Sequence, residues 1–259
     1  MKKGLLTILI VTLLTTLTLA MTAQEVLDEM EASNQEFDTS RQQYELTGVD
    51  GEGNEDSSKI MDSYILVTEA NGDEKENYTM MRVVEPRNLS GTTVMTLSED
   101  EQYVYMPDYR KVKRITGNSK NDNFLDTDLK YSDISLLSGE VKEDNEPSML
   151  EETETHYTIK VDILDSDTDY DYMVMVITKD GLLLEETGFF NAAGKKLKEM
   201  LISDYTTIDG YRIFKRLEIT DLEKDHKTLM ELLEAEFDIP ITERFFSTLN
   251  MSSRILRYR

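Results

Sequence analysis

Four aspartates at alternate positions are the side chains most suggestive of chemistry in this chain of 259 residues. They are Asp165, Asp167, Asp169 and Asp171. Oxygen ligands at this spacing begin a calcium-binding loop, which also needs a glycine at its sharp turn and a bidentate glutamate at its end. Tyr170 and Val176 occupy those two positions, so we interpret the aspartates as the solvated tip of a hairpin.

The remaining residue types of catalytic and metal sites form no recognisable set. His156 and His226 are the two histidines and the chain has no cysteine, so a zinc site lacks ligands at a usable spacing. The sequence has no nucleophile elbow, phosphate-binding glycine loop or dinucleotide fingerprint. Among 52 acidic residues some carboxylates will lie close together by chance, which is no sign of acid–base catalysis. We therefore expect no enzyme, no metal and no cofactor.

The overall charge limits the classes of partner. The formal net charge is -24, and such a field excludes nucleic-acid binding unless the basic residues gather in one strong patch. Four basic residues between positions 110 and 114 are too few for that. The same field disfavours lying flat on an anionic membrane.

The apolar residues suggest a capacity for greasy ligands. The chain has 14 methionines, 13 tyrosines and 8 phenylalanines, and no tryptophan. Methionine is flexible and polarizable, which suits a surface that accepts varied apolar ligands, although it also fills irregular cores. Six methionines fall in predicted strands, and some of them are candidates to line a cavity: Met80, Met81, Met95, Met106, Met173 and Met175.

Residues 1–20 have the pattern of a secretory signal peptide. Lys2 and Lys3 precede an apolar stretch over residues 5–19, with cleavage expected after Ala20 or Ala23. The alternative is a membrane anchor, but the threonines make this stretch shorter and more polar than a span requires. We expect export to the periplasm and one domain over residues 21–259. Without a cysteine, the exported chain has no site for N-terminal lipidation.

The elements that would position any site are mostly strands. Thr22 and Glu25 have the spacing of a capping box and predict an N-terminal helix. From residue 42 short alternating segments separated by turn residues predict an antiparallel meander. Residues 139–147 read as an exposed acidic loop and 241–249 as a short closing helix or turn. Residues 229–237 fit a helix by propensity and a strand by the resemblance described next, which we follow.

Residues 103–134 carry a recognisable pattern. A run of aromatic and apolar residues ends at Pro107, a strand with alternating basic residues follows over 110–115, and acids and aromatics interleave over 124–134. This resembles the outer-membrane lipoprotein-sorting proteins of the LolA-like superfamily, whose members have an aromatic-x-Tyr-Leu-Pro strand, a basic strand ending in Arg-Ile, and a segment like Ser-Phe-Met-Gly-Ser-Asp-Phe-Ser-Tyr-Glu-Asp. The chain departs from this pattern with Tyr103 for Trp, Asp126 for Gly and Leu129 for Phe.

The resemblance extends over nearly all of the chain after the leader. Pro86 and residues 91–92 fit the family's preceding turn and strand, and residues 191–198 and 208–211 fit its later hairpins. It implies a mainly β (α+β) fold, in which a strongly curved antiparallel sheet forms an incomplete β-barrel with short helices over its open side. Losing the glycine at Asp126 weakens the case for a special backbone conformation there, although aspartate tolerates left-handed geometry better than most residues.

The resemblance also implies a function and a set of site residues. We expect a soluble periplasmic carrier that shelters the acyl chains of lipoproteins or a related lipid, with an ABC-type exporter or large export permease of the inner membrane and an outer-membrane acceptor as partners. The candidates for lipid contact are Tyr103, Tyr105, Met106, Phe124 and Tyr131. The candidates for a headgroup or partner contact are Arg110, Lys111, Lys113 and Arg114, unless these only form a solvated strand face. The alternative is a sensor on the same fold that binds without transporting.

Overall fold

The computed structural model describes residues 21–34, 37–70, 74–98, 101–136, 146–164 and 168–258. The predicted leader, Asp165, Asp167 and most of the predicted loop at 139–147 lie outside the described residues. Within the described part, thirteen strands form one antiparallel sheet with a few short helices. None of the described helices is long and apolar enough to cross a membrane.

The first six strands are β1 (Thr39–Val49), β2 (Glu55–Ala70), β3 (Glu74–Glu85), β4 (Thr93–Ser98), β5 (Glu101–Met106) and β6 (Lys111–Ile115). The other seven are β7 (Glu146–Glu152), β8 (His156–Asp162), β9 (Tyr172–Thr178), β10 (Leu184–Phe190), β11 (Lys196–Ile208), β12 (Tyr211–Asp221) and β13 (His226–Phe237). The α-helices are α1 (Ala23–Asn34), α2 (Tyr131–Leu136) and α3 (Thr248–Met251), and the 3-10 helices are η1 (Gly117–Asn121) and η2 (Glu243–Phe245).

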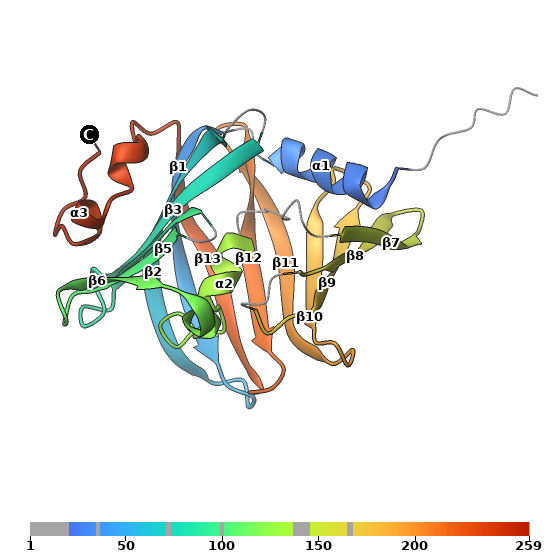
Figure 1. The fold of residues 1–259 in the computed structure, drawn as a ribbon, viewed down its shortest axis with the longest axis horizontal. Coiled ribbons are helices and arrows are strands. Elements are labelled where there is room, and N and C mark those ends of the chain that lie inside the picture. Colours follow the sequence, from blue (N-terminus) through green and yellow to red (C-terminus); the bar gives the residue numbers. More distant parts are fainter. Residues whose placement is uncertain are drawn as a thin grey trace, which may run out of the picture.

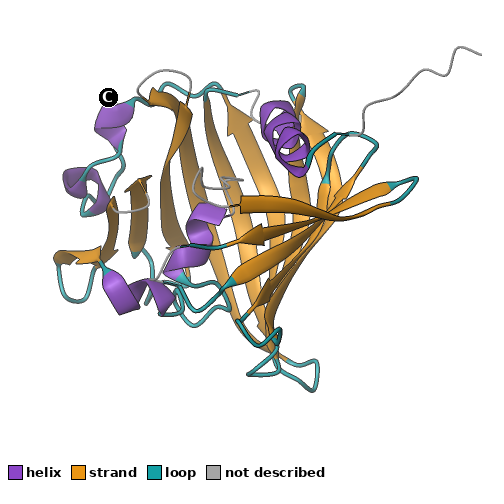
Figure 2. Cartoon of the chain, turned by 45° about the vertical axis from the view of Figure 1, so that its right-hand side comes forward, coloured by secondary structure: helices purple, strands orange, loops and turns teal. Residues whose placement is uncertain are grey.

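The strand order places the middle of the chain at the two edges of the sheet. The order is β6-β5-β4-β3-β2-β1-β13-β12-β11-β10-β9-β8-β7, so that β1 and β13 pair at the centre (Figure 1). Strands β6 and β7 follow one another in sequence but form opposite edges, and the sheet is therefore open. The predicted mainly β antiparallel fold is confirmed, while the sheet does not close into a barrel. Helix α2, which follows β6 in the chain, lies over one face of the sheet (Figures 1 and 2).

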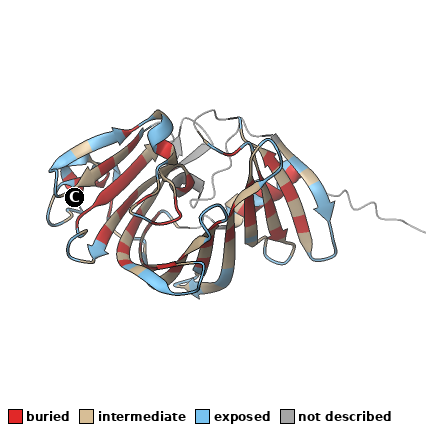
Figure 3. Cartoon of the chain, turned by 90° about the horizontal axis from the view of Figure 1, so that it is seen from below, coloured by how far each residue is buried: buried red, intermediate tan, exposed pale blue. Residues whose placement is uncertain are grey.

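Side chains of both faces are buried, in two separate apolar clusters. Met80 pairs with Tyr64 and with Met95, and directly paired residues point to the same side of a sheet. These three belong to a cluster that we call the outer cluster, which also includes Phe245 and Phe246. The neighbouring positions in the strands point to the opposite side and belong to a larger group, the inner cluster, which includes Met61, Met81, Val94 and Val104. Buried positions alternate with more exposed ones along many strands (Figure 3).

Helix α1 begins as its sequence predicts and covers the inner cluster. The Thr22 amide donates to Glu25 Oε2 at 2.7 Å, and the Glu25 amide donates to Thr22 Oγ1 at 3.2 Å, which completes the capping box. The buried side chains of the helix are Ala23, Val26, Leu27 and Met30, and all four pack in the inner cluster. The predicted N-terminal helix is thereby confirmed, and one of its sides faces the core.

Two local predictions meet different outcomes. Residues 226–237 form strand β13, so the resemblance prevailed over helix propensity, as long-range pairing with β1 and β12 outweighs a local preference. The prediction of a loop over residues 139–147 is wrong at its C-terminal end, because β7 begins at Glu146 and Pro147 pairs with Val161 of β8. An edge strand pairs on one side only, and there a proline is tolerated.

The end of the chain packs on the outer face. Residues 239–258, which we call the C-terminal segment, contain the predicted short helical turn as η2 and α3. Ile241, Phe245, Phe246 and Met251 are buried in the outer cluster against Tyr64, Met80 and Met95. In Figures 1 and 2 this segment lies outside the β2–β6 half of the sheet.

Candidate functional site

The inner face of the sheet is the strongest candidate for a binding site because it is rich in methionine. Six strands contribute methionines to the inner cluster on this face: Met61, Met81, Met173, Met175, Met200 and Met230, with Met106 packed at its margin. The predicted cavity candidates divide accordingly, since Met80 and Met95 point to the outer face. Thioether side chains adapt to differently shaped apolar ligands. A face of this composition suits an acyl chain better than a polar substrate.

A second element lies over the inner face beside α1. Residues 122–133, which we call the inner segment, carry Phe124 and Leu129, both of which are fully buried in the inner cluster. Phe124 packs edge-on against Tyr131, with ring centroids 5.8 Å apart. Leu125 and Asp126 have φ angles of 50° and 57°, so the left-handed geometry that a glycine would favour occurs at Asp126 without one.

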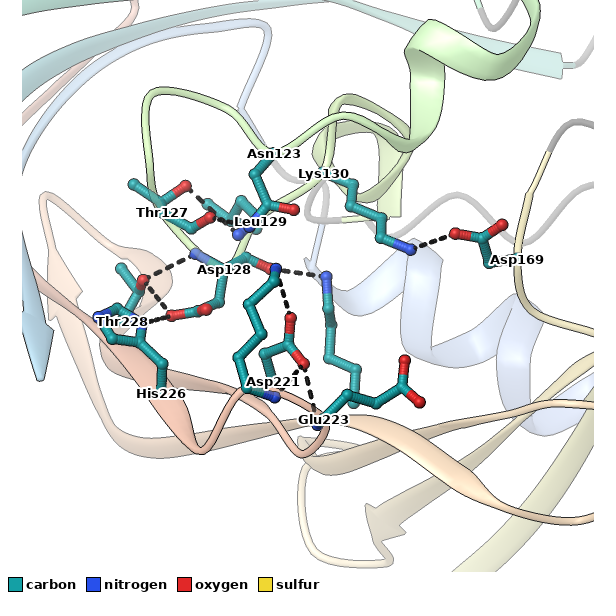
Figure 4. Close-up of polar contacts among 12 residues, drawn as sticks. Asn123, Thr127, Asp128, Leu129, Lys130, Asp169, Asp221, Glu223, His226 and Thr228 are labelled. Atoms are coloured by element: carbon teal, nitrogen blue, oxygen red, sulfur yellow. Dashed lines mark hydrogen bonds and ion pairs between the residues drawn. The ribbon is translucent and has the colours of Figure 1, made fainter. Parts of the chain in front are cut away.

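The inner segment is fixed to the sheet by polar contacts around Asp128 (Figure 4). This carboxylate is 2% exposed, and its Oδ2 lies 2.6 Å from His226 Nδ1 and accepts a hydrogen bond from Thr228 Oγ1 at 2.8 Å. The Asp128 amide in turn donates to Thr228 Oγ1 at 2.9 Å. The other ring nitrogen of His226, Nε2, lies 3.1 Å from a carboxylate oxygen of Asp56.

His226 therefore lies between two carboxylates. Partial burial lowers the pKa of the imidazole, but the hydrogen bonds and charges of Asp128 and Asp56 outweigh burial and raise it above the usual value. With an acceptor at each nitrogen, the geometry favours the doubly protonated imidazolium. These two partners lie 98 and 170 residues from His226 in the sequence, so no local spacing indicates them.

A buried ion pair fixes the other end of the inner segment. Lys198 of β11 is 3% exposed and pairs with Asp133, which is fully buried. Lys198 Nζ also donates to the Asp128 carbonyl at 2.6 Å, and the Lys130 amide donates to Asp133 Oδ2 at 2.8 Å. The Lys130 ammonium lies 2.7 Å from a carboxylate oxygen of Asp169. We call these contacts, together with those of His226, the inner polar cluster.

Tyr170 is the aromatic wall of this cluster. Its ring lies 4.8 Å from that of Phe189, and the ammonium groups of Lys130 and Lys198 lie 4.7 and 5.7 Å from its centroid. Burial first, and the neighbouring charge of Asp133 second, raise the pKa of the Tyr170 hydroxyl. Tyr170 stays neutral and shields the Lys198–Asp133 pair from water. Among the described residues no group of acidic or histidine side chains has the arrangement of a metal site.

The predicted lipid-contact residues do not all lie on one face. Phe124 is in the inner cluster, and Met106 and Tyr131 pack against it. Tyr103 and Tyr105 pack against the outer cluster instead, near the C-terminal segment. The structure thus brings three of the five candidates together on the inner face and separates the two tyrosines of β5 from them.

The predicted basic residues occupy the β5–β6 turn and the edge strand β6. Arg110, Lys111, Lys113 and Arg114 are all exposed. Lys111 and Lys113 share a side with Met106 and Val104, their partners in β5, whereas Arg114 pairs with Tyr103 on the other side. The alternation expected for β6 is present, so the four basic side chains do not form one binding face.

Comparison with known proteins places this geometry in a class. A protein-family model described as "Uncharacterized protein" matches residues 75–253, more than half of the chain, so the chain belongs to that family. No curated protein matches the sequence. Three solved structures that match at 16–20% identity show the fold, which is LolA-like.

Three solved structures illustrate the likeness. A domain from Vibrio parahaemolyticus, described as a candidate outer-membrane lipoprotein-sorting protein, has a TM-score of 0.79 at 20% identity, covering 89% of this chain and 98% of its own. A DUF1329 family protein from Desulfovibrio piger also has a TM-score of 0.79, at 18% identity, with 88% and 97% covered. A LolA superfamily protein from Nitrosomonas europaea has a TM-score of 0.68 at 16% identity, with 88% and 99% covered.

Proposed function

We propose that the protein is a periplasmic carrier that shelters the acyl chains of lipoproteins, or of a related lipid, and moves them toward the outer membrane. In this proposal the sheet acts as an incomplete barrel with its open side covered by α1 and α2. The observation that supports it most is the methionine-rich inner face beneath a helix whose four buried side chains are all apolar. The likeness to a candidate lipoprotein-sorting domain agrees with it.

The energetics of α1 favour it as the element that makes way for cargo. Its three large buried side chains, Val26, Leu27 and Met30, contribute about 5–9 kcal/mol when buried. An acyl chain of about sixteen carbons gains roughly 13 kcal/mol when its methylenes leave water. Cargo that replaces α1 on the inner face therefore offsets the loss of the helix contacts.

The direct test is to identify what the protein carries. Mass spectrometry of protein recovered from its own periplasm is expected to detect bound lipid or acylated peptide, and the lipid-free protein is expected to bind a synthetic acylated peptide. A non-acylated peptide of the same sequence serves as the control. Protein that is reproducibly free of lipid and also ignores the acylated peptide would rule out carriage.

A second experiment tests the role of α1. Tyr157 Oη lies 3.8 Å from Met21 Sδ, so these side chains join the start of the helix to β8. Because the chain has no cysteine, Met21→Cys and Tyr157→Cys together can be joined by a reducible bifunctional reagent without side reactions. The joined protein is expected to take up less acylated peptide and to recover uptake after reduction. The two single variants, treated alike, should be unaffected; unchanged uptake in the joined protein refutes a moving α1.

A further inference from the structure

The three most exposed large apolar side chains of the described residues belong to two segments. They are Ile255 at 78%, Leu249 at 71% and Tyr109 at 68% of full exposure. Ile255 and Leu249 lie in the C-terminal segment, and Tyr109 lies in the turn between β5 and β6. Exposed side chains of this size gathered at one place mark an interaction site.

Contacts with the outer cluster and with Arg82 hold these two segments near each other. Leu256, Tyr105 and Val112 all pack against the outer cluster. Arg82 Nη2 donates to the Ser253 carbonyl at 2.8 Å, which fixes the chain just before Ile255. A Cβ on Gly91 would lie within 3.5 Å of both Pro107 and Arg82, so the β5–β6 turn approaches the same arginine. Figures 1 and 2 show α3 and β6 at the same end of the sheet.

The charge of this region is opposite to that of the protein. Residues 103–115 and residues 239–259 each contain four basic residues and one acidic residue, whereas the whole chain has a net charge of -24. Arg110, Arg114, Arg244, Arg254 and Arg257 are exposed, whereas Lys111 and Lys113 lie on the inner side of β6 and do not belong to this region. The acidic side chains of the two stretches, Asp108 and Glu243, are exposed as well but are outnumbered by the basic ones. We call this region, with Tyr109, Leu249 and Ile255, the basic–apolar surface.

Basic and apolar side chains together fit the interface of an anionic bilayer. Lysine and arginine are attracted to anionic headgroups, and protruding apolar side chains enter the boundary between headgroups and acyl chains. The acidic bulk of the protein would repel such a membrane, but charges farther away than about 8 Å are largely screened at physiological ionic strength.

We propose that the basic–apolar surface binds the protein peripherally to membranes rich in anionic lipid, with Ile255, Leu249 and Tyr109 in the headgroup region. Because it uses the outer face, this binding does not require that the inner face carry cargo. It would bring a carrier to the membrane where it collects or releases its cargo.

The lack of tryptophan allows a site-specific test. Ile255→Trp introduces a single tryptophan at the surface, and Leu150→Trp introduces one at an exposed position of β7, the opposite edge of the sheet. With vesicles of phosphatidylglycerol and phosphatidylcholine, the emission of the Ile255→Trp protein is expected to shift to shorter wavelength. No shift is expected with phosphatidylcholine alone, at high salt, or for the Leu150→Trp protein.

Charge reversal tests the basic component. Adding Arg254→Glu and Arg257→Glu to the Ile255→Trp protein is expected to weaken vesicle binding at least tenfold, since each basic residue near an anionic surface changes the partition coefficient by about fivefold. Lys195→Glu and Lys215→Glu are the matched control, because both lysines are exposed, Lys195 just before β11 and Lys215 in β12. Thermal unfolding verifies that each variant is folded. Any of three results would overturn the proposal: no shift in the Ile255→Trp emission, an equal shift for Leu150→Trp, or binding to an acidic protein but to no vesicle.

Discussion

Replacing His226 by glutamine removes the only imidazole of the inner polar cluster and should destabilise the protein in a pH-dependent way. The lost hydrogen bond joins a protonated ring to the buried carboxylate of Asp128 at 2.6 Å. Hydrogen bonds to charged groups contribute about 1.5–3 kcal/mol, and Asp56 adds little because half of its side chain is exposed. For a domain of this size the loss corresponds to a fall in Tm of roughly 3–12 °C at pH 5.5–6.

The dependence on pH follows from the raised pKa of His226. A histidine whose pKa is higher in the folded than in the unfolded state stabilises the protein fully below the unfolded value of about 6.5, and this contribution is lost as the pH rises through the folded pKa. The free energy of unfolding of the wild type should therefore fall above pH 6.5, by up to about 1.4 kcal/mol per pH unit, and approach that of the variant by pH 9. Asp221, whose pKa is lowered, acts in the opposite sense and only under acid conditions.

The assay is urea unfolding of the wild type and of His226→Gln at pH values from 5.5 to 9, together with the imidazole titration by NMR. His156→Gln is the matched control, because His156 lies 2.9 Å from Glu185 in a more exposed pair and should contribute under about 0.5 kcal/mol. With two histidines in the chain, the same variant assigns the NMR signals. An equal loss of stability at pH 6 and pH 9, or a His226 pKa at or below 6.5, would refute a stabilising contact between a charged His226 and Asp128.

Three further changes test other parts of the structure. Lys198→Met should lower the free energy of unfolding by about 3–5 kcal/mol, because it leaves the carboxylate of Asp133 buried without its cation. Adding Asp133→Leu should recover much of the loss, and urea unfolding that finds the double variant less stable than Lys198→Met would contradict this. Asp126→Val should destabilise the protein by about 1–2 kcal/mol, because a β-branched residue is disfavoured at the left-handed φ of 57°, whereas Asp126→Gly should leave the Tm equal or higher. Equal Tm values for the two variants would show that the left-handed backbone at this position does not limit stability. Arg82→Met removes the hydrogen bond to the Ser253 carbonyl, so limited proteolysis after Arg254 should become faster. An unchanged cleavage rate would mean that the outer cluster alone holds the C-terminal segment in place.

Local patterns predicted most of the elements. The capping box at Thr22 and the antiparallel hairpins predicted from residue 42 each involve neighbours in sequence, so the residues themselves indicate the structure. The pairing of β1 with β13 joins positions nearly 200 residues apart, and no local pattern specifies it. It followed from the resemblance, which also decided strand over helix for β13.

The inner polar cluster was missed because its partners are distant in sequence. Asp128 lies 98 residues from His226, and Asp133 lies 65 residues from Lys198. From the sequence, Asp122, Asp126 and Asp128 are candidates to balance the basic strand before them, but Asp128 is buried against β13, and Asp133 is buried against β11. One signal was present, since Lys198 falls in a strand next to apolar positions where a lysine is unusual.

The same cluster decides where cargo would lie if the proposed carriage is correct. Moving the inner segment would leave Asp128, Asp133 and Lys198 without partners, and each broken buried pair costs about 3–5 kcal/mol. Loss of the buried Phe124 and Leu129 adds about 3–6 kcal/mol. These losses sum to about 9–16 kcal/mol, which is comparable to the roughly 13 kcal/mol that one acyl chain of sixteen carbons gains and larger than the about 5–9 kcal/mol that α1 loses. An acyl chain is therefore expected to displace α1, whose contacts are apolar, and to lie on the inner face beside an inner segment that stays in place.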